Sequence, residues 1–271
     1  EQQEALLTQL IGGELQGAFA YLERQSRYDL NDVATSASST SDGYSISGEK
    51  TVVFNGMAAD KLVVSARTAG DQQDESGISV FLVDANDSGV SRTGYRLMDG
   101  QTVANISFDG AHGELLGVEG EAYGPLQQVV DAATLALSGE AMGIMQYLHD
   151  STVEYSRTRE QFGVAIGSFQ ALQHRMVETF MSCEQMRSML VRAVCSSLEQ
   201  SDEEQKDLHA LKMVLSRHGK LVGDEAIQIH GGMGMTDELD IGHYVKRLMM
   251  INTIFGNGDY HQDKFNQLAY S

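Results

Sequence analysis

An arginine and a glycine turn interrupt a helix-like region between residues 154 and 175, EYSRTREQFGVAIGSFQALQHR. Arg159 carries a permanently charged guanidinium whose planar donor fork suits a phosphate or a carboxylate. The turn at Phe162-Gly163 would let the backbone approach such an anion closely. These residue types predict an anion site, although a plain helix–helix turn with solvated arginines has the same pattern.

A second glycine turn lies in QIHGGMGMT, residues 228 to 236. Gly231, Gly232 and Gly234 do not have the G-x-G-x-x-G spacing, and no strand is predicted before them, which excludes a Rossmann site. One glycine is enough to cap the C-terminus of a helix. Three glycines leave two interpretations open, a helix cap or the close approach of a ligand or of another chain.

Other chemistries have little support in the sequence. His230, His243 and His261 lack i, i+4 spacing and a paired cysteine or carboxylate, so no metal site is predicted. Cys183 and Cys195 lie in one predicted helix and would point to different sides, which favours free thiols in a reducing cytoplasm. Neither a G-x-S-x-G motif nor a P-loop is present.

The composition is that of a globular chain with a strongly negative charge. Its 271 residues, 42% of them apolar, are enough for two modest domains or one large one. The net charge of -19 argues against nucleic-acid binding and favours a strongly solvated surface over the alternative, an acidic face that binds a partner. No apolar run is long enough to span a membrane, and the first residues do not resemble a signal peptide. A cytoplasmic location is therefore expected.

The periodicity of the chain changes after Gly120. Before it, short segments rich in Val, Ile, Phe and Ser alternate with turn formers and predict an antiparallel sheet or small barrel. They span 17–21, 43–55, 61–66, 77–84 and 102–108, and the Ser/Thr-rich stretch 35–41 is interpreted as a loop. After Gly120, helical spacing predicts four helices over 125–160, 168–199, 202–230 and 238–252.

Strands that precede helices indicate an α+β chain and not a doubly wound α/β fold. We expect an antiparallel β-barrel or sandwich domain over 15–120, followed by an antiparallel four-helix bundle over 121–271. The only proline, Pro125, suits the start of the first long helix, where its missing N–H does no harm.

Taken together, EYSRTREQFGVAIGSFQALQHRM and AIQIHGGMGMTDELDIGHYVKRL resemble the acyl-CoA dehydrogenase family. GEKTVVFNG is similar to the G-x-K-x-W-I-T/S-N-G motif of the family's middle domain. FGVAIGSFQALQHR, GISVFLVDA and TIFGNGDYH are most similar to the small subunit of pimeloyl-CoA dehydrogenase-type heteromeric enzymes. The resemblance covers the whole chain and assigns residues 1–14 to the end of an N-terminal helical domain, the rest of which is missing.

The resemblance implies FAD, with its isoalloxazine ring between the β domain and the helices and its pyrophosphate arm at the neighbouring subunit. The residues implied to meet that arm are Arg159, Phe162, Gly163, Gln228, Gly231, Gly232 and Gly234. Phe54 stands where a Thr or Ser of the family meets the flavin; it can stack there but cannot donate a hydrogen bond. The family's L-T-E-P-G-A-G-S-D loop corresponds to YLERQSRYDL, residues 21 to 30, which lacks its proline and glycines.

The catalytic base that the resemblance implies is absent. In the family, a glutamate removes the α-proton of an acyl-CoA thioester, and the β-hydrogen leaves as a hydride to the flavin. The two positions that the family uses for this base are Gly256 and Ala133 here, the latter followed by Thr134, and none of these side chains can take the proton. Asp259 and Glu140 are the nearby carboxylates in sequence, with no geometric argument for either.

These departures favour the small, base-lacking subunit of a heteromeric acyl-CoA dehydrogenase, paired with a larger subunit that carries the glutamate. Two alternatives stay open: a homo-oligomeric dehydrogenase with a relocated base, and a non-redox scaffold that binds a partner or a CoA ester. Oligomerisation through the C-terminal helices and an electron-transfer flavoprotein as electron acceptor are further implications of the resemblance. Fatty, dicarboxylic and steroid side-chain thioesters all remain possible substrates.

Overall fold

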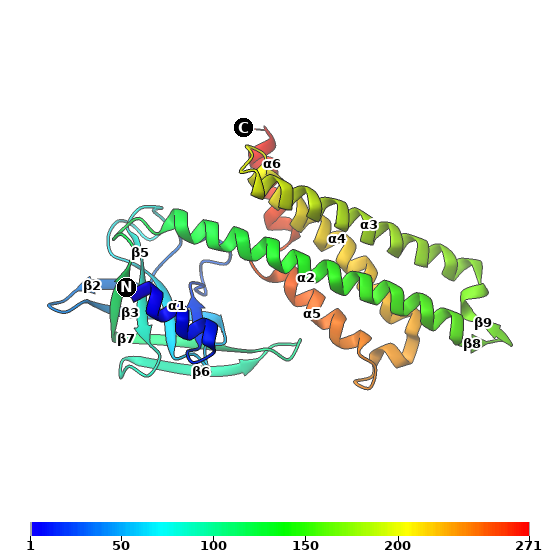
Figure 1. Cartoon of the computed structure of the whole chain (residues 1–271), viewed down its shortest axis with the longest axis horizontal. Helices are drawn as coiled ribbons and strands as arrows, with labels where there is room; N and C mark the ends of the chain where they lie inside the picture. The colour runs from blue at the N-terminus through cyan, green and yellow to red at the C-terminus, as the bar shows by residue number, and fades with distance from the viewer. Residues whose placement is uncertain (1, 271) are drawn as a thin grey trace. The chain divides into compact units, whose positions relative to one another are not determined.

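The computed structural model describes residues 2–270, and the chain divides into two compact units, Glu1–Val129 and Val130–Ser271 (Figure 1). The first unit begins with α1 (Gln2–Gly12) and continues with the strands of one sheet. These strands are β1 (Gly17–Ala20), β2 (Ser36–Ser39), β3 (Tyr44–Phe54), β4 (Lys61–Arg67), β5 (Ile78–Asp84), β6 (Val90–Arg96) and β7 (Thr102–Leu116). The helix α2 (Tyr123–Thr158) follows them, so the predicted order of strands before helices is confirmed.

The sheet closes on itself through β4. Its order is β1-β4-β2-β3-β7-β5, and β5 pairs back onto β4 from Lys61↔Asp84 to Arg67↔Ile78. Closure of this kind removes most of the exposed strand edges that would otherwise invite aggregation. The predicted barrel is confirmed, but it is not purely antiparallel, because β1 and β2 both pair with β4 in parallel.

Two strands lie where the sequence did not predict them. The stretch 35–41, predicted to be a loop, contains β2, which pairs antiparallel with β3. The strand β6 pairs with β7 from Val90↔Phe108 to Arg96↔Thr102. Most of its residues are exposed and several are polar, so it lacks the apolar alternation by which half-buried strands are recognised. Pairing with the long neighbour β7, and not burial, holds β6 in place.

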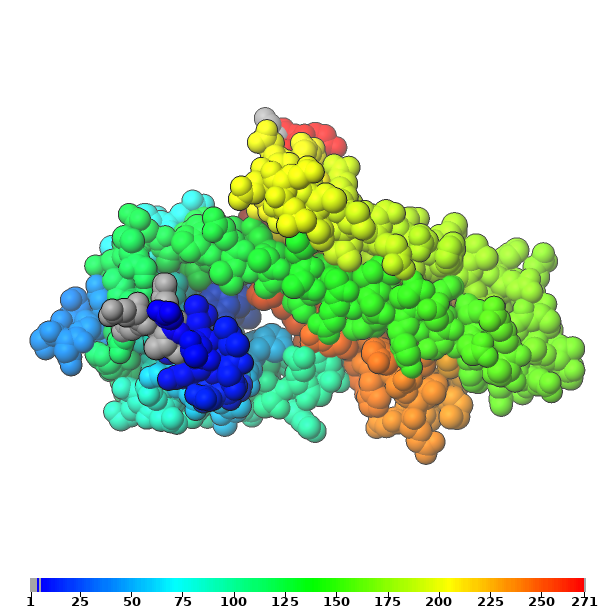
Figure 2. Space-filling view, viewed as in Figure 1, coloured from blue at the N-terminus to red at the C-terminus, as the bar shows by residue number. Residues whose placement is uncertain are grey.

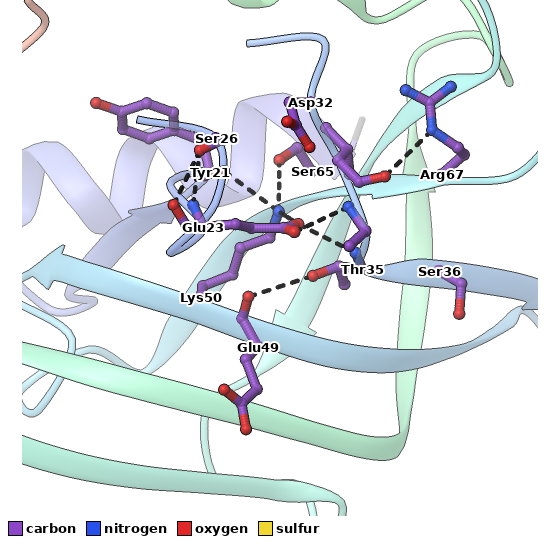
Figure 3. Close-up of polar contacts among 12 residues, drawn as sticks. Tyr21, Glu23, Ser26, Asp32, Thr35, Ser36, Glu49, Lys50, Ser65 and Arg67 are labelled. Atoms are coloured by element: carbon purple, nitrogen blue, oxygen red, sulfur yellow. Dashed lines mark hydrogen bonds and ion pairs between the residues drawn. The ribbon is translucent and has the colours of Figure 1, made fainter. Parts of the chain in front are cut away.

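A buried ion pair holds the segment that precedes β2 against the barrel (Figure 3). Lys50 Nζ donates to Glu23 Oε1 at 2.7 Å and to Ser65 Oγ at 3.0 Å. Glu23 also accepts the backbone N–H groups of Ala34 and Thr35, at 2.8 and 3.1 Å. Burial opposes the charge on Glu23, but the charge of Lys50 and the hydrogen bonds from Lys50, Gln25 and Thr35 bring the pKa of the carboxyl below its usual value. Burial lowers the pKa of Lys50 to about 8, so both groups are charged at neutral pH.

The second unit is a bundle in which α2 is joined by α3 (Gln170–Leu198), α4 (Glu204–His230), α5 (Ile241–Thr253) and α6 (Gly258–Tyr270). The helices α2 to α5 run side by side (Figure 1) and share one apolar core that includes Met145, Met186, Leu211 and Ile251. The described residues therefore form five helices here, not the four predicted. The fifth, α6, is largely polar, and Asn257 Oδ1 supports its first turn by accepting the Tyr260 N–H at 3.0 Å.

The two cysteines follow the predicted division, since Cys183 lies in the core and Cys195 is exposed, and both are free. Burial raises the pKa of the Cys183 thiol to about 11. None of the helices within residues 2–270 has the length and the apolarity needed to cross a membrane.

Candidate cofactor site

The pause in the helical region is a β-hairpin. The helix α2 ends at Thr158, and β8 (Glu160–Gln161) pairs with β9 (Val164–Ala165) around Phe162-Gly163. Both turn residues have positive φ, +56° and +80°, as in a type I′ turn. The N–H of Ile166 donates to Arg159 O at 2.8 Å and closes the hairpin base. Arg159 therefore lies between the end of α2 and the start of the hairpin.

Phe162 is the least expected residue of this turn. It is 92% exposed although it is large and apolar, and it is a non-glycine residue at positive φ. Such a conformation costs about 1 kcal/mol or more and persists where the surroundings or a function require it. An exposed, strained aromatic side chain is typical of a contact surface for a ligand or another chain.

The three glycines of the second turn differ in what the fold demands of them. Gly231 caps α4 with φ +61°, a conformation that favours glycine. Gly234 is buried, and a Cβ on it would come within 3.1 Å of Ile227 O. Gly232 has neither a positive φ nor any heavy atom within 4 Å of a Cβ built on it. Its backbone is therefore open to close approach from outside.

Tyr155 brings the two turns together. Its ring stacks on the ring of His230, with 4.3 Å between centroids and 28° between planes. Tyr155 lies one helical turn before Arg159, and the Arg159 N–H donates to Tyr155 O. His230 directly precedes Gly231, and its Nδ1 lies 2.8 Å from Ala226 O, so this histidine has a packing role.

Figure 2 shows the hairpin region, in yellow-green, at one end of the helical unit, with the α4–α5 connection in orange at its lower edge. The connection contains the short helix η2 (Gly231–Met235). The sequence predicted both turns as separate motifs. It missed Tyr155, whose contact with His230 depends on how α2 and α4 pack and leaves no local signal.

Two polar side chains at these turns are available to a ligand. Arg159 is exposed and forms no ion pair with any described residue, whereas Arg157 pairs with Glu154 at 3.5 Å. Gln228 is exposed and its carboxamide has no hydrogen-bond partner within the described part of the chain. An unpaired guanidinium, an amide and an open glycine backbone fit a phosphate-bearing group.

The two positions that the resemblance implies for the catalytic base, Gly256 and Ala133, have no side-chain group that accepts a proton. Gly256 is buried, with φ +115°, in the loop between α5 and α6. Ala133 has no polar atom in its side chain, and Thr134 Oγ1 donates to Val130 O at 2.7 Å within α2. Neither of these two positions therefore presents a carboxylate.

The two carboxylates proposed as substitutes differ in their surroundings. Glu140 accepts from both Nε and Nη2 of Arg247, at 2.6 and 2.9 Å, so both of its oxygens are engaged in one bidentate pair. Asp259 lies exposed in the first turn of α6. Glu140 is thus the weaker candidate, because it would have to leave Arg247 before it could accept a proton.

On the barrel, Phe54 is the last residue of β3; it is half-buried and in register with Val103. The pairing of β3 with β7 is interrupted between Lys50 and Val53, and Val52 in this bulge has φ +52°. A β-branched residue at positive φ is a genuine backbone outlier, and such strain gathers at functional sites. Nothing in the residue types of this stretch pointed to Val52.

The described residues contain no group of three or more His, Cys, Asp or Glu side chains arranged to hold a metal ion. His243 contacts Asp237 O at 3.3 Å, and His261 pairs with His209 at 2.8 Å. The three histidines of the C-terminal part therefore have separate partners.

The comparisons with known proteins match both units. Residues 18–111 match the family model "Acyl-CoA dehydrogenase, middle domain", and residues 126–266 match "Acyl-CoA dehydrogenase, C-terminal domain". The mitochondrial isovaleryl-CoA dehydrogenase of Oryza sativa subsp. japonica is 31% identical over 250 residues, which are 89% of this chain and 60% of the relative. The chain thus spans about 60% of the length of that relative.

Two solved structures have the same fold. PigA with FAD and proline superposes with a TM-score of 0.91 and 26% identity, covering 98% of this chain and 70% of that one. A variant of the Tcur3481-Tcur3483 steroid ACAD gives a TM-score of 0.85 and 26% identity, covering 99% and 71% of the two chains. Since family models match the sheet unit and most of the helical unit in the expected order, the chain belongs to the acyl-CoA dehydrogenase family.

Proposed function

We propose that this chain is the small subunit of a heteromeric, FAD-dependent acyl-CoA dehydrogenase. It would contribute a phosphate-binding part of the flavin site, and a larger subunit would contribute the catalytic glutamate. One observation carries the proposal: the turns at Arg159 and Gly232 remain open to an anion, while both family positions of the base, Gly256 and Ala133, have no group that takes a proton.

The residues proposed to hold FAD fit its pyrophosphate by charge and by shape. Arg159 would neutralise a phosphate oxygen, and Gln228 would donate a hydrogen bond beside it. Gly231 and Gly232 would present backbone without side chains in the way. When bound, FAD supplies the hydride acceptor for α,β-dehydrogenation. Phe162, exposed beside Gly163, would cover the adenine end or pack against the neighbouring subunit.

The proposed substrate is an acyl thioester of coenzyme A, as the family's name and the isovaleryl-CoA dehydrogenase of rice suggest. The larger partner is proposed because this chain lacks a base. The similarity to the Tcur3481-Tcur3483 steroid ACAD supports it, since that enzyme is named for two chains. An electron-transfer flavoprotein is the proposed electron acceptor, on the family resemblance alone.

The homo-oligomeric alternative keeps one specific observation in its favour. Asp259 is a carboxylate exposed only three residues after Gly256, in the first turn of α6. If Asp259 were the relocated base, its replacement by asparagine would abolish dehydrogenation by the lone chain. Glu140 is disfavoured by its bidentate pair with Arg247.

The proposed flavin seat is tested by titrating FAD into the chain and following the quenching of flavin fluorescence. Replacing Arg159 by glutamine removes one charge-assisted contact, so we expect FAD affinity to fall about 10- to 100-fold. Arg157→Gln is the matched control, because Arg157 lies two residues away, is exposed and already pairs with Glu154. Equal loss in both variants, or no loss in Arg159→Gln, would contradict the assignment.

A further inference from the structure

A pair of buried histidines contacts the loop between α5 and α6, in which the resemblance places the family's base at Gly256. His209 on α4 and His261 on α6 are 8% and 3% exposed, and their Nδ1 atoms lie 2.8 Å apart. The other ring nitrogen of His261, Nε2, lies 3.1 Å from Phe255 O. One chain of hydrogen bonds therefore joins α4, α6 and the backbone of the loop between α5 and α6.

The donor and acceptor groups in this series of hydrogen bonds determine which ring nitrogens carry a proton. A carbonyl oxygen only accepts, so Nε2 of His261 carries a hydrogen and donates it to Phe255 O. In a neutral imidazole the second nitrogen is then an acceptor, so Nδ1 of His261 accepts from Nδ1–H of His209. The two histidines therefore have opposite tautomers. Both nitrogens of His261 are engaged, so this ring cannot act as the missing base.

Lys212 holds the beginning of the same loop. Its Nζ donates to Ile251 O and Ile254 O, both at 2.9 Å, and the residue is 1% exposed. Burial lowers the pKa of Lys212 to about 7 and that of His209 to about 4. Burial, together with the nearby Lys212, lowers the pKa of His261 to about 3. Both rings are thus neutral at pH 7, as their hydrogen bonds require.

Gly256 lies against this cluster with no room for a side chain. Its φ of +115° lies outside the range that L-residues adopt readily. A Cβ built on Gly256 would lie 2.5 Å from Nε2 of His261 and 2.6 Å from Cδ1 of Tyr260. The ring of His261 therefore occupies the space that the stem of a longer side chain would need.

We propose that His261 is a positioning residue that, with His209 and Lys212, holds the loop from Phe255 to Gly258 in a shape that admits only glycine at position 256. The chain then excludes a carboxylate from this loop by its packing, and a single substitution at Gly256 cannot restore one. The inference depends on the proposed function only for the statement that position 256 corresponds to the family's base.

A thermal double-mutant cycle on the full chain, followed by circular dichroism at helical wavelengths, tests the packing directly. We expect Gly256→Ala to lower the Tm by roughly 5–10 °C, because it combines a clash with a disfavoured φ. Gly117→Ala is the matched control, since Gly117 has φ +80° but no atom within 4 Å of a built Cβ. In a His261→Ala background the loss caused by Gly256→Ala should be measurably smaller, although the contact with Tyr260 Cδ1 and the disfavoured φ remain.

The inference is overturned if Gly256→Ala costs no more than Gly117→Ala, or if its cost is the same with and without His261. A second measurement needs no variant at all. Long-range ¹⁵N–¹H spectra of the histidine rings at pH 7 should show an Nδ1–H tautomer for His209 and an Nε2–H tautomer for His261. The same tautomer in both rings, or a charged ring, would contradict the proposed chain of hydrogen bonds.

The claim that one substitution cannot restore a base is tested by measuring dehydrogenase activity. We expect the lone Gly256→Glu chain, supplied with FAD and an acyl-CoA, to remain inactive as a dehydrogenase; activity would overturn the inference. A failed cycle would leave the flavin seat at Arg159 untouched. Conversely, loss of the Arg159 assignment would leave the tautomers and the coupling between Gly256 and His261 as predicted, so the two proposals fail separately.

Discussion

At the scale of single residues, residues of the same type have different roles in this protein. Gly231 and Gly234 satisfy the backbone and the packing of their own turn, whereas Gly232 is required by neither. Arg157 has an ion-pair partner, and Arg159 has none among the described residues. Identity and spacing predicted these positions as candidates, but only the geometry separates the residues that serve the fold from those that are open to a ligand.

The histidine pair predicts a dependence of stability on pH. In the unfolded chain both rings titrate near pH 6.5, but in the fold burial, with Lys264 near His209 and Lys212 near His261, lowers their pKa values to about 4 and about 3. The unfolded state therefore binds more protons between these limits. Their contribution to stability is complete above pH 6.5 and is lost progressively as the pH falls from 6.5 to the folded pKa values of about 4 and about 3.

Urea unfolding of the full chain at pH 7, 5.5 and 4.5, followed by circular dichroism, measures this loss. A His209→Phe/His261→Leu variant should show a smaller fall in the free energy of unfolding over this range. The quantity compared is the change of this free energy with pH, and not its absolute value. The carboxylates contribute equally to that change in both proteins, so a difference between them reports the histidines. Equal slopes in the two proteins would contradict neutral, buried rings.

At the scale of elements, the sequence predicted what has strong periodicity. The helices α2 to α5 and the strands β1, β3, β4, β5 and β7 were expected near their observed positions, because apolar spacing marks them. The exposed strand β6 and the largely polar helix α6 were missed, because few of their residues are apolar. The candidate site was predicted as motifs, but the Tyr155–His230 contact and the His209–His261 pair depend on packing between distant helices.

In the β8–β9 hairpin we expect one substitution to increase stability and to weaken binding. Asn-Gly is the sequence that type I′ turns prefer, and this chain has Phe-Gly there. We expect Phe162→Asn to raise the free energy of unfolding by about 0.5–1 kcal/mol, because it relieves strain and removes an exposed aromatic ring. The same variant should bind FAD, or assemble with other subunits, less well than the original chain.

Denaturant unfolding and size-exclusion chromatography measure the two effects. Leu198→Asn is the control, since Leu198 is 81% exposed but ends a helix without a positive φ. It should bring no comparable gain in stability. A destabilised Phe162→Asn chain would show that the aromatic ring supports the hairpin itself and is not reserved for a partner.

At the scale of the whole molecule, the net charge makes the proposed anion site at Arg159 unusual. The chain has 38 acidic and 19 basic residues, a net charge of -19 that repels an anion approaching most of its surface. The protein belongs to the acyl-CoA dehydrogenase family, and the match to the Oryza sativa enzyme covers 89% of this chain. The proposed arrangement, with a flavin contact in this chain and the base in a larger subunit, would account for an anion site in a chain that lacks the proton acceptor.

The absence of a base in this chain can be tested by anaerobic absorption spectroscopy of the lone chain, saturated with FAD and mixed with a panel of acyl-CoA thioesters. We expect the visible flavin band to stay unbleached with every thioester. Bleaching should appear when a co-purified larger acyl-CoA dehydrogenase subunit is added. Bleaching by the lone chain, especially if Asp259→Asn abolishes it, would contradict the small-subunit proposal and establish a relocated base in this chain.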